Sequence, residues 1–163
     1  MGGAGPAGDG QHRLRHRGRL RAELIRHVGA RAGRPGQIAD SHAFHADFAR
    51  AEAKLRAATA LVRETWDDVE RTLDAGRKLD VRQETMARLA LNHITWTVAE
   101  VARFVHASVG TSALRDGLMQ RLFRDVHAGT AHITSGPQAL RECGRELAGL
   151  AQGESWVLFG LQA

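Results

Sequence analysis

The chain has 163 residues, a length that supports one domain with a substantial core and excludes an assembly of several domains. Hydrophobic residues make up 43% of it, prolines number only 3 and tyrosine is absent, a composition that predicts an all-helical protein. The net charge of +5 is unevenly spread, because residues 1–36 hold eight arginines against two acidic residues. The remainder of the chain is close to neutral, so the charge alone does not indicate a nucleic-acid-binding fold.

The cysteine content and the hydropathy of the sequence bear on the cellular compartment of the protein. Cys143 is the only cysteine, so no disulfide within the chain is expected. No stretch of about 18 apolar residues is present, and the N-terminus has no apolar segment typical of a signal peptide. We therefore expect a cytoplasmic protein without a membrane anchor.

Residues 1–36 form the first predicted unit, an arginine-rich head that we expect to be disordered or weakly helical. Its first ten residues are rich in glycine and cannot bury apolar surface. Residues 20–28 have one weak apolar face and predict a short helix. No aromatic residue lies between the arginines, so we consider binding to nucleic acid unlikely, although it stays open as a third function.

Residues 37–152 form the second unit, a predicted four-helix up-down bundle. Apolar residues recur every three or four positions over residues 41–75 and predict one long helix that Gly76 ends. Asp80 and Gln83 have the spacing of a capping box that begins a second helix over residues 81–109. This second helix is apolar on more than one side, which is typical of a helix in the middle of a bundle. We expect His93 to be a buried core residue within it.

Residues 119–133 predict the third helix, with an apolar face and a polar face. At about 100° per residue, Arg121, Asp125, Ala128 and His132 share the polar face. We expect Arg121 and Asp125 to form an ion pair between adjacent turns. A fourth amphipathic helix of about four turns follows Gly136 and Pro137, and its predicted apolar face holds Ala139, Leu140, Cys143, Leu147 and Leu150. Residues 153–163 form the third unit, an apolar tail that must dock on this chain or another, or stay exposed.

The sequence lacks the motifs of several common classes of metal site and enzyme. No glutamate has a histidine three positions later, which excludes the carboxylate-bridged di-iron bundle. The cysteine and histidine spacings match no zinc site, and the phosphate-binding-loop and serine-hydrolase motifs are absent. We therefore expect no metal site.

Four segments together indicate a family. They are DFARAEAKLRAATALVRETWDDV, the connection KLDVRQ, HASVGTSALRDG, and LMQRLFRDVHAGTAHI with its R-D-x-H-x-x-x-x-H pattern. From Phe48 to Leu150 the chain resembles the C-terminal helical domain of acyl-CoA dehydrogenase-like flavoproteins. The branch that it resembles most is that of the two-component flavin monooxygenases, which includes dibenzothiophene monooxygenase.

The resemblance implies a flavin cofactor, FAD or FMN, a small organic substrate and site residues. His132 corresponds to a histidine that faces the flavin ring and handles protons, and His127 is the second catalytic candidate. The cofactor-binding candidates are Gly110, Thr111, Ser112, Arg121 and Arg124. The resemblance also implies a homo-oligomer that packs through its helical faces.

Two departures from the family pattern limit the prediction. Acyl-CoA dehydrogenases carry a glutamate base before a Gly-Thr pair, whereas Ala128 precedes Gly129 and Thr130 here, which disfavours abstraction of an acyl-CoA α-proton. Relatives also place a helical domain and a β-barrel before the bundle, so we expect a truncated protein that shares its flavin site with another domain or subunit and is inactive alone. The alternative is a helical oligomerisation or binding module without catalytic activity.

Overall fold

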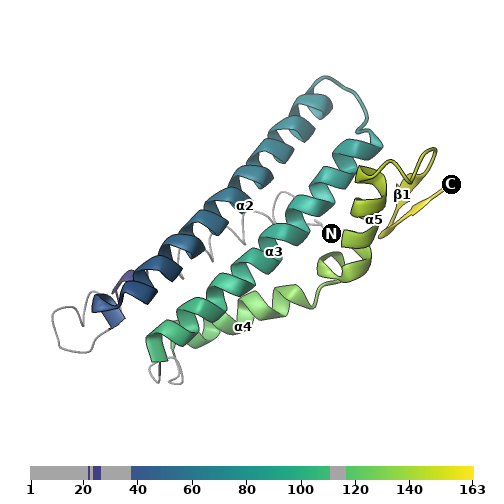
Figure 1. The fold of residues 1–163 in the computed structure, drawn as a ribbon. Helices are drawn as coiled ribbons and strands as arrows, with labels where there is room; N and C mark the ends of the chain where they lie inside the picture. Colours follow the sequence, from purple (N-terminus) through teal and green to yellow (C-terminus); the bar gives the residue numbers. More distant parts are fainter. Residues whose placement is uncertain (1–21, 23, 27–37, 111–116) are drawn as a thin grey trace.

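The structure, a computed structural model, describes residues 22, 24–26, 38–110 and 117–163 of the chain. Helices account for most of these residues, and a small two-stranded sheet follows them (Figure 1). The elements are η1 (Ile38–Asp40), α2 (His42–Asp74), α3 (Val81–Val109), α4 (Leu118–Thr130), η3 (Ile133–Ser135), α5 (Pro137–Leu147), β1 (Ser155–Val157) and β2 (Gly160–Gln162). The prediction of an all-helical chain is thus confirmed apart from the terminal sheet.

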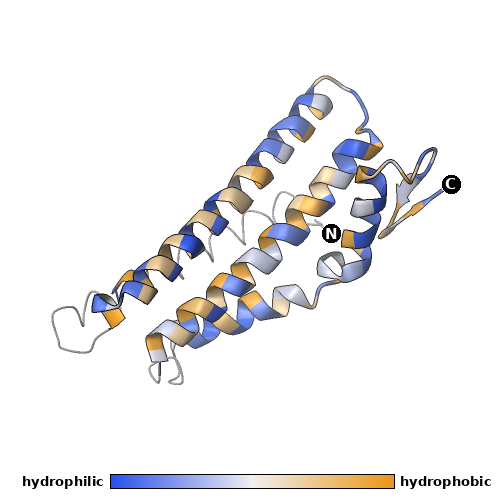
Figure 2. Ribbon diagram, in the orientation of Figure 1, coloured by the Kyte–Doolittle hydropathy of each residue, from blue (hydrophilic) through white to orange (hydrophobic). Residues whose placement is uncertain are grey.

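The two long helices α2 and α3 lie antiparallel and side by side (Figure 1). The Ser41 side chain caps α2 by accepting a hydrogen bond of 3.3 Å from the Phe44 N–H. Along α2, apolar and polar residues alternate so that one stripe faces α3 (Figure 2). Leu55, Ala58 and Val62 in this stripe are buried. The predicted helix over residues 41–75 is therefore confirmed.

The connection between α2 and α3 follows the predicted signals. Gly76 has φ +67°, and its N–H donates to the Leu73 carbonyl while the Arg77 N–H donates to the Thr72 carbonyl. These two bonds form a Schellman motif, in which a left-handed residue ends the helix. At the start of α3, Asp80 and Gln83 form both hydrogen bonds of the predicted capping box, at 2.7 and 3.3 Å.

Helix α3 occupies the centre of the fold, as its apolar composition predicted. It contacts α2 along one side and both α4 and α5 along another (Figure 1). The buried core residues come mostly from α3, with smaller contributions from the other helices. They are Leu24, Leu55, Ala58, Val62, Ala90, Ile94, Val98, Ala99, Val101, Ala102, Val105, Val109, Leu122 and Val126.

The chain after α3 differs from a simple four-helix up-down arrangement. Helices α4 and α5 lie one after the other along α3, and the short η3 separates them (Figure 1). The predicted helix over residues 119–133 ends at Thr130, so the prediction that it extends to Ile133 was wrong. Two half-length helices therefore cover the length of α3 that one helix of a regular bundle would cover.

The predicted arginine-rich head also contributes to the core. Leu24 is helical and only 1% exposed, and it belongs to the same buried cluster as Leu55 and Ile94. Residues 22, 25 and 26 of the predicted head are also helical, and residues 1–21, 23 and 27–36 lie outside the described residues. The bundle therefore includes at least one residue from before the predicted boundary at residue 37.

The last helix and the tail differ in detail from the prediction. Helix α5 buries Ala139, Glu142 and Cys143, whereas Leu140 and Leu147, which the sequence placed on its apolar face, are 47% and 38% exposed. The tail forms an antiparallel hairpin in which Trp156 pairs with Leu161. None of the helices in the described ranges is long and apolar enough to cross a membrane.

Candidate functional site at the turn between α4 and α5

Helix α4 has the predicted apolar and polar faces over its own length. Leu122 and Val126 are buried against the core, whereas Arg121, Arg124 and Asp125 are exposed. The structure has no ion pair between Arg121 and Asp125, so the predicted pair was wrong. In the part of the chain that the structure describes, Arg121 and Arg124 both lack an acidic partner. Their guanidinium groups are open to an anion.

His132 lies outside α4, so the prediction that it shares the polar helical face of Arg121 was wrong. The helix ends before it, because Ala131 is the C-cap of α4 and His132 is the N-cap of η3. The imidazole is exposed, and its Nδ1 lies 2.8 Å from the Thr134 Oγ1 and 3.4 Å from the Thr134 backbone N. A backbone N–H only donates, so Nδ1 acts as an acceptor and the neutral ring carries its hydrogen on Nε2.

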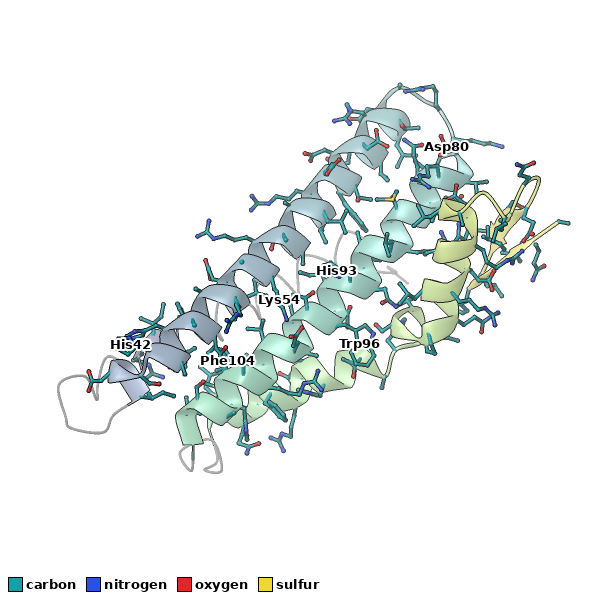
Figure 3. The ribbon with its side chains drawn as sticks, viewed as in Figure 1. His42, Lys54, Asp80, His93, Trp96 and Phe104 are labelled. Carbon is teal, nitrogen blue, oxygen red and sulfur yellow. The ribbon has the colours of Figure 1, made fainter. Side chains whose placement is uncertain are left out.

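The turn that carries His132 is attached firmly to α3. The Asn92 Nδ2 donates to the carbonyls of Thr134 and Gly136 at 3.3 and 3.4 Å, and the Trp96 Nε1 donates to the Ser135 carbonyl at 2.8 Å. Figure 3 shows Trp96 on α3 beside this turn. Asn92 is 3% exposed, so it is a buried polar group whose donors are used.

Ser135 fixes the same turn from within. Its side chain is 2% exposed and donates a hydrogen bond of 3.2 Å to the Gly129 carbonyl near the end of α4. Two α3 side chains and one turn side chain together hold the backbone from Thr134 to Gly136. The structure thereby provides an exposed imidazole on a turn whose backbone is held in place, which is a general requirement of a catalytic group.

His127, the second catalytic candidate, is half-buried on α4. Its Nδ1 lies 2.9 Å from the Phe123 carbonyl, which only accepts, so Nδ1 carries the hydrogen. The Phe123 ring lies between two imidazoles, with centroids 4.1 Å from His127 and 4.4 Å from His106. These ring contacts pack α4 against the end of α3 and give His127 a structural role.

The remaining candidate residues lie at the end of α3. Gly110 is its C-cap, with φ +58°, a backbone conformation that favours glycine. Thr111 and Ser112 lie outside the described residues. Of the predicted cofactor-binding residues, the structure therefore describes Gly110, Arg121 and Arg124, the last two on the exposed side of α4.

His93 differs from its prediction, because it is exposed on α3 rather than buried in the core (Figure 3). Its neighbours Asn92 and Ile94 are the buried residues at this level of the helix. The sequence did not predict Asn92, Trp96 and Thr134 as residues that position the turn. One signal was present, since Asn92 and Trp96 are four residues apart and share a helical face.

A second polar cluster attaches the end of α5 to the hairpin. The Glu142 carboxylate is 4% exposed and accepts hydrogen bonds from Arg141 and from Arg145, the latter at 2.6 Å. These bonds, from Arg141 first and then Arg145, lower the pKa of Glu142 below its ordinary value. Arg145 also donates to Glu154 at 2.7 Å, just before β1. Next to Glu142, burial raises the pKa of the Cys143 thiol to about 11.

The described residues contain no set of side chains that could hold a metal ion. Over those residues, no group of three histidine, cysteine, aspartate or glutamate side chains is arranged to hold a metal ion. The turn therefore exposes an imidazole, which suits proton transfer, and α4 separately exposes the guanidinium groups of Arg121 and Arg124, which suit anion binding.

Comparison with known protein families identified the family of the chain. The family model described as acyl-CoA dehydrogenase, C-terminal domain, matches residues 18–137. This range includes Leu24, α2, α3 and α4 and ends at the first residue of α5. No curated protein matches the chain. The matched range covers most of the chain and contains every residue proposed above for the site.

Proposed function

The chain belongs to the acyl-CoA dehydrogenase C-terminal domain family, and from this we propose that it serves as the helical domain of a flavin-dependent oxidoreductase of the monooxygenase type. The observation that carries the proposal is the His132 imidazole, which is exposed on a turn held by Asn92 and Trp96. An acyl-CoA dehydrogenase mechanism is less well supported, because Ala128 replaces the carboxylate base that it needs.

The described residues fit one wall of a flavin site. Arg121 and Arg124 are exposed, and their guanidinium groups are suited to bind phosphate oxygens. A flavin bound there supplies the redox chemistry. The remaining walls of the site come from another domain or another subunit, because a ligand of this size needs most of its surface enclosed.

His132 acts as the proton donor and acceptor in this proposal. Its Nδ1 is engaged by Thr134, so proton exchange occurs at Nε2, for which the described residues provide no hydrogen-bond partner. Imidazole suits this task, since it exchanges protons near neutral pH. The hydrogen bonds to the turn keep the ring in one orientation, which lowers the entropic cost of placing it beside a reacting group.

Titration of the full chain with FAD and with FMN tests the proposal. Flavin absorbance and fluorescence should change on binding, and the double variant Arg121→Ala with Arg124→Ala should weaken binding roughly tenfold through loss of charge-assisted hydrogen bonds. His132→Ala should alter the pH dependence of the spectral change, whereas His93→Ala, which removes another exposed histidine, should not. Because one wall of a site binds flavin weakly, the titration extends to about 1 mM chain, and flavin spectra that stay unchanged at this concentration would contradict the proposal.

A second function, a helical oligomerisation module, is favoured by exposed leucines on α5 and just after it. Leu140, Leu147 and Leu150 are 47%, 38% and 70% exposed, an unusual concentration of large apolar side chains. The module predicts a stable oligomer without affinity for flavin. Measuring the solution mass of the wild type and of Leu147→Glu tests it, because a charge in such an interface should dissociate the oligomer.

A further inference from the structure

A cleft lies at the end of the fold where α2 and α3 join, and it extends to Thr134, whose hydroxyl contacts the His132 imidazole. Its volume is about 410 Å³, which falls within the range of small-molecule sites in proteins. The walls come from α2, from α3, from the turn and first residues of α5, and from the tip of the terminal hairpin. Elements far apart in the sequence therefore form one concave surface.

The lining of the cleft is mostly apolar and includes two aromatic rings. The main apolar lining residues are Trp66, Val69, Leu79, Ala87, Leu91 and Phe159. The charged lining groups are Glu84 and Arg88, which form an ion pair of 3.4 Å one helical turn apart on α3. Because their charges compensate each other, the cleft offers no net charge to a ligand. A neutral ligand is favoured over an anion, which would be desolvated beside Glu84.

The hairpin wall of the cleft is held by specific contacts. The Trp156 Nε1 donates to the Thr85 Oγ1 at 2.8 Å, and the Arg88 guanidinium lies 4.2 Å from the centre of the Trp156 ring. Arg88 also donates to the Leu158 carbonyl at 3.4 Å. These contacts fix the tip of the hairpin, with Leu158 and Phe159, over the cleft.

The backbone at Leu158 is strained where it meets the cleft. Leu158 is the first of two residues between β1 and β2, and it has φ +53°, a conformation that favours glycine or asparagine at such a turn. Its side chain is 77% exposed yet lines the cleft. Strained residues are found at ligand-binding elements, where the side chain serves the site rather than the turn.

We propose that this cleft binds a small neutral aromatic molecule, with Trp66 and Phe159 as apolar walls and the hairpin tip as its cover. The Thr134 hydroxyl, which also lines the cleft, is its uncharged polar group; it donates its hydrogen to the His132 Nδ1 and can accept a hydrogen bond from the ligand. The ligand is about the size of two or three aromatic rings, given the volume of the cleft. The inference does not depend on flavin binding at α4.

A matched pair of fluorescent probes tests the charge preference. N-phenyl-1-naphthylamine is neutral and becomes brighter in apolar sites, and 8-anilino-1-naphthalenesulfonate adds a sulfonate to the same ring system. In about 0.3 M salt, which screens the basic residues, the neutral probe should bind with a stoichiometry of about one per chain and at least about tenfold more tightly. Equal affinities, or no brightening with the neutral probe, would overturn the proposal.

Two variants test the location. Ala87→Trp fills the cleft and should abolish probe binding, while Ala53→Trp adds the same side chain to an exposed position on α2 and should not. Leu158→Gly relieves the backbone strain and removes part of the cover, so it should weaken binding roughly fivefold without loss of thermal stability. Leu150→Ala, at an exposed leucine outside the cleft lining, is its control. Unchanged binding in both Ala87→Trp and Leu158→Gly would place the probe elsewhere.

Discussion

The two sides of α3 are held by different kinds of interaction. On the side of α2, most of the buried contact is made by small and aliphatic residues such as Ala58, Ala90 and Ile94, and polar contacts such as those of Gln83 with Asp68 and Thr72 are fewer. On the side of α4 and α5, three α3 side chains form hydrogen bonds with the turn and the hairpin. They are Asn92, Trp96 and Thr85. The first side derives its stability from apolar burial, and the second derives the conformation of a turn and a hairpin from hydrogen bonds.

This difference between the two sides of α3 explains why the candidate catalytic residue, His132, lies on the side of α4 and α5. A continuous apolar interface favours a long regular helix, and α2 presents its exposed polar side chains along one uninterrupted surface. On the other side, the break between α4 and α5 creates the turn that exposes His132. The polar contacts supply hydrogen-bond partners to the backbone groups of this irregular segment. A regular helix would not need them, because its backbone groups pair with each other. Functional groups are often found on such turns over a rigid helical support.

The largest effect should come from the apolar side. Ile94→Ala removes a side chain that is 0% exposed in the centre of α3, and we expect the free energy of unfolding to fall by about 3 kcal/mol because a cavity remains. Urea denaturation measures this loss. Ile133→Ala removes the same atoms from a residue that is 57% exposed, so a comparable loss there would contradict the assignment of the core.

A smaller and more local effect is expected on the polar side. Asn92→Leu keeps a similar volume but leaves the Thr134 and Gly136 carbonyls without their donor, at a cost of about 2 kcal/mol. Amide hydrogen exchange should show lost protection that is concentrated in residues 132–136. His93→Ala, one position along the same helix, should change neither quantity. Uniform loss of protection over all helices would mean that Asn92 supports the whole fold instead of the turn.

The Glu142 cluster makes the polar side sensitive to acid. Glu142→Gln should lower the free energy of unfolding by about 1 kcal/mol at pH 7, because it weakens the bonds from Arg141 and Arg145. The pKa of Glu142 is lowered in the folded protein, so its stabilisation is present above the ordinary value of 4.5 and is lost as the pH falls through the folded value. The difference between variant and wild type should therefore narrow below about pH 4. Glu64→Gln, at an exposed position on α2, serves as the control.

The smallest effect is expected at alkaline pH and concerns Cys143. The thiol has its pKa raised from 9.0 to about 11 in the folded protein, so ionisation favours the unfolded chain. This stabilisation is complete well below pH 9 and is lost as the pH rises from 9 toward 11, with about 1 kcal/mol lost at pH 10. In urea titrations from pH 8 to 10, stability should fall more steeply for the wild type than for Cys143→Ala. Equal slopes would show that the thiol reaches solvent.

The sequence by itself determined the helical class, the extents of α2 and α3, and the turn between them. Those features depend on local signals, namely the apolar period, the Ser41 and Asp80 caps and Gly76, which act through neighbouring residues. The family resemblance likewise rested on short motifs and is confirmed at the level of the C-terminal domain family.

Only the tertiary structure decided where α4 ends, and with it the place of His132. The apolar pattern continues to Ile133, yet the chain leaves the helix because Asn92, Trp96 and Ser135 satisfy the backbone groups of a turn at this point. The same reason applies to the hairpin, whose Trp156 depends on Thr85, a residue 71 positions earlier. Hydrogen bonds between residues so distant in sequence leave no periodic signal, so they appear only once the chain is folded.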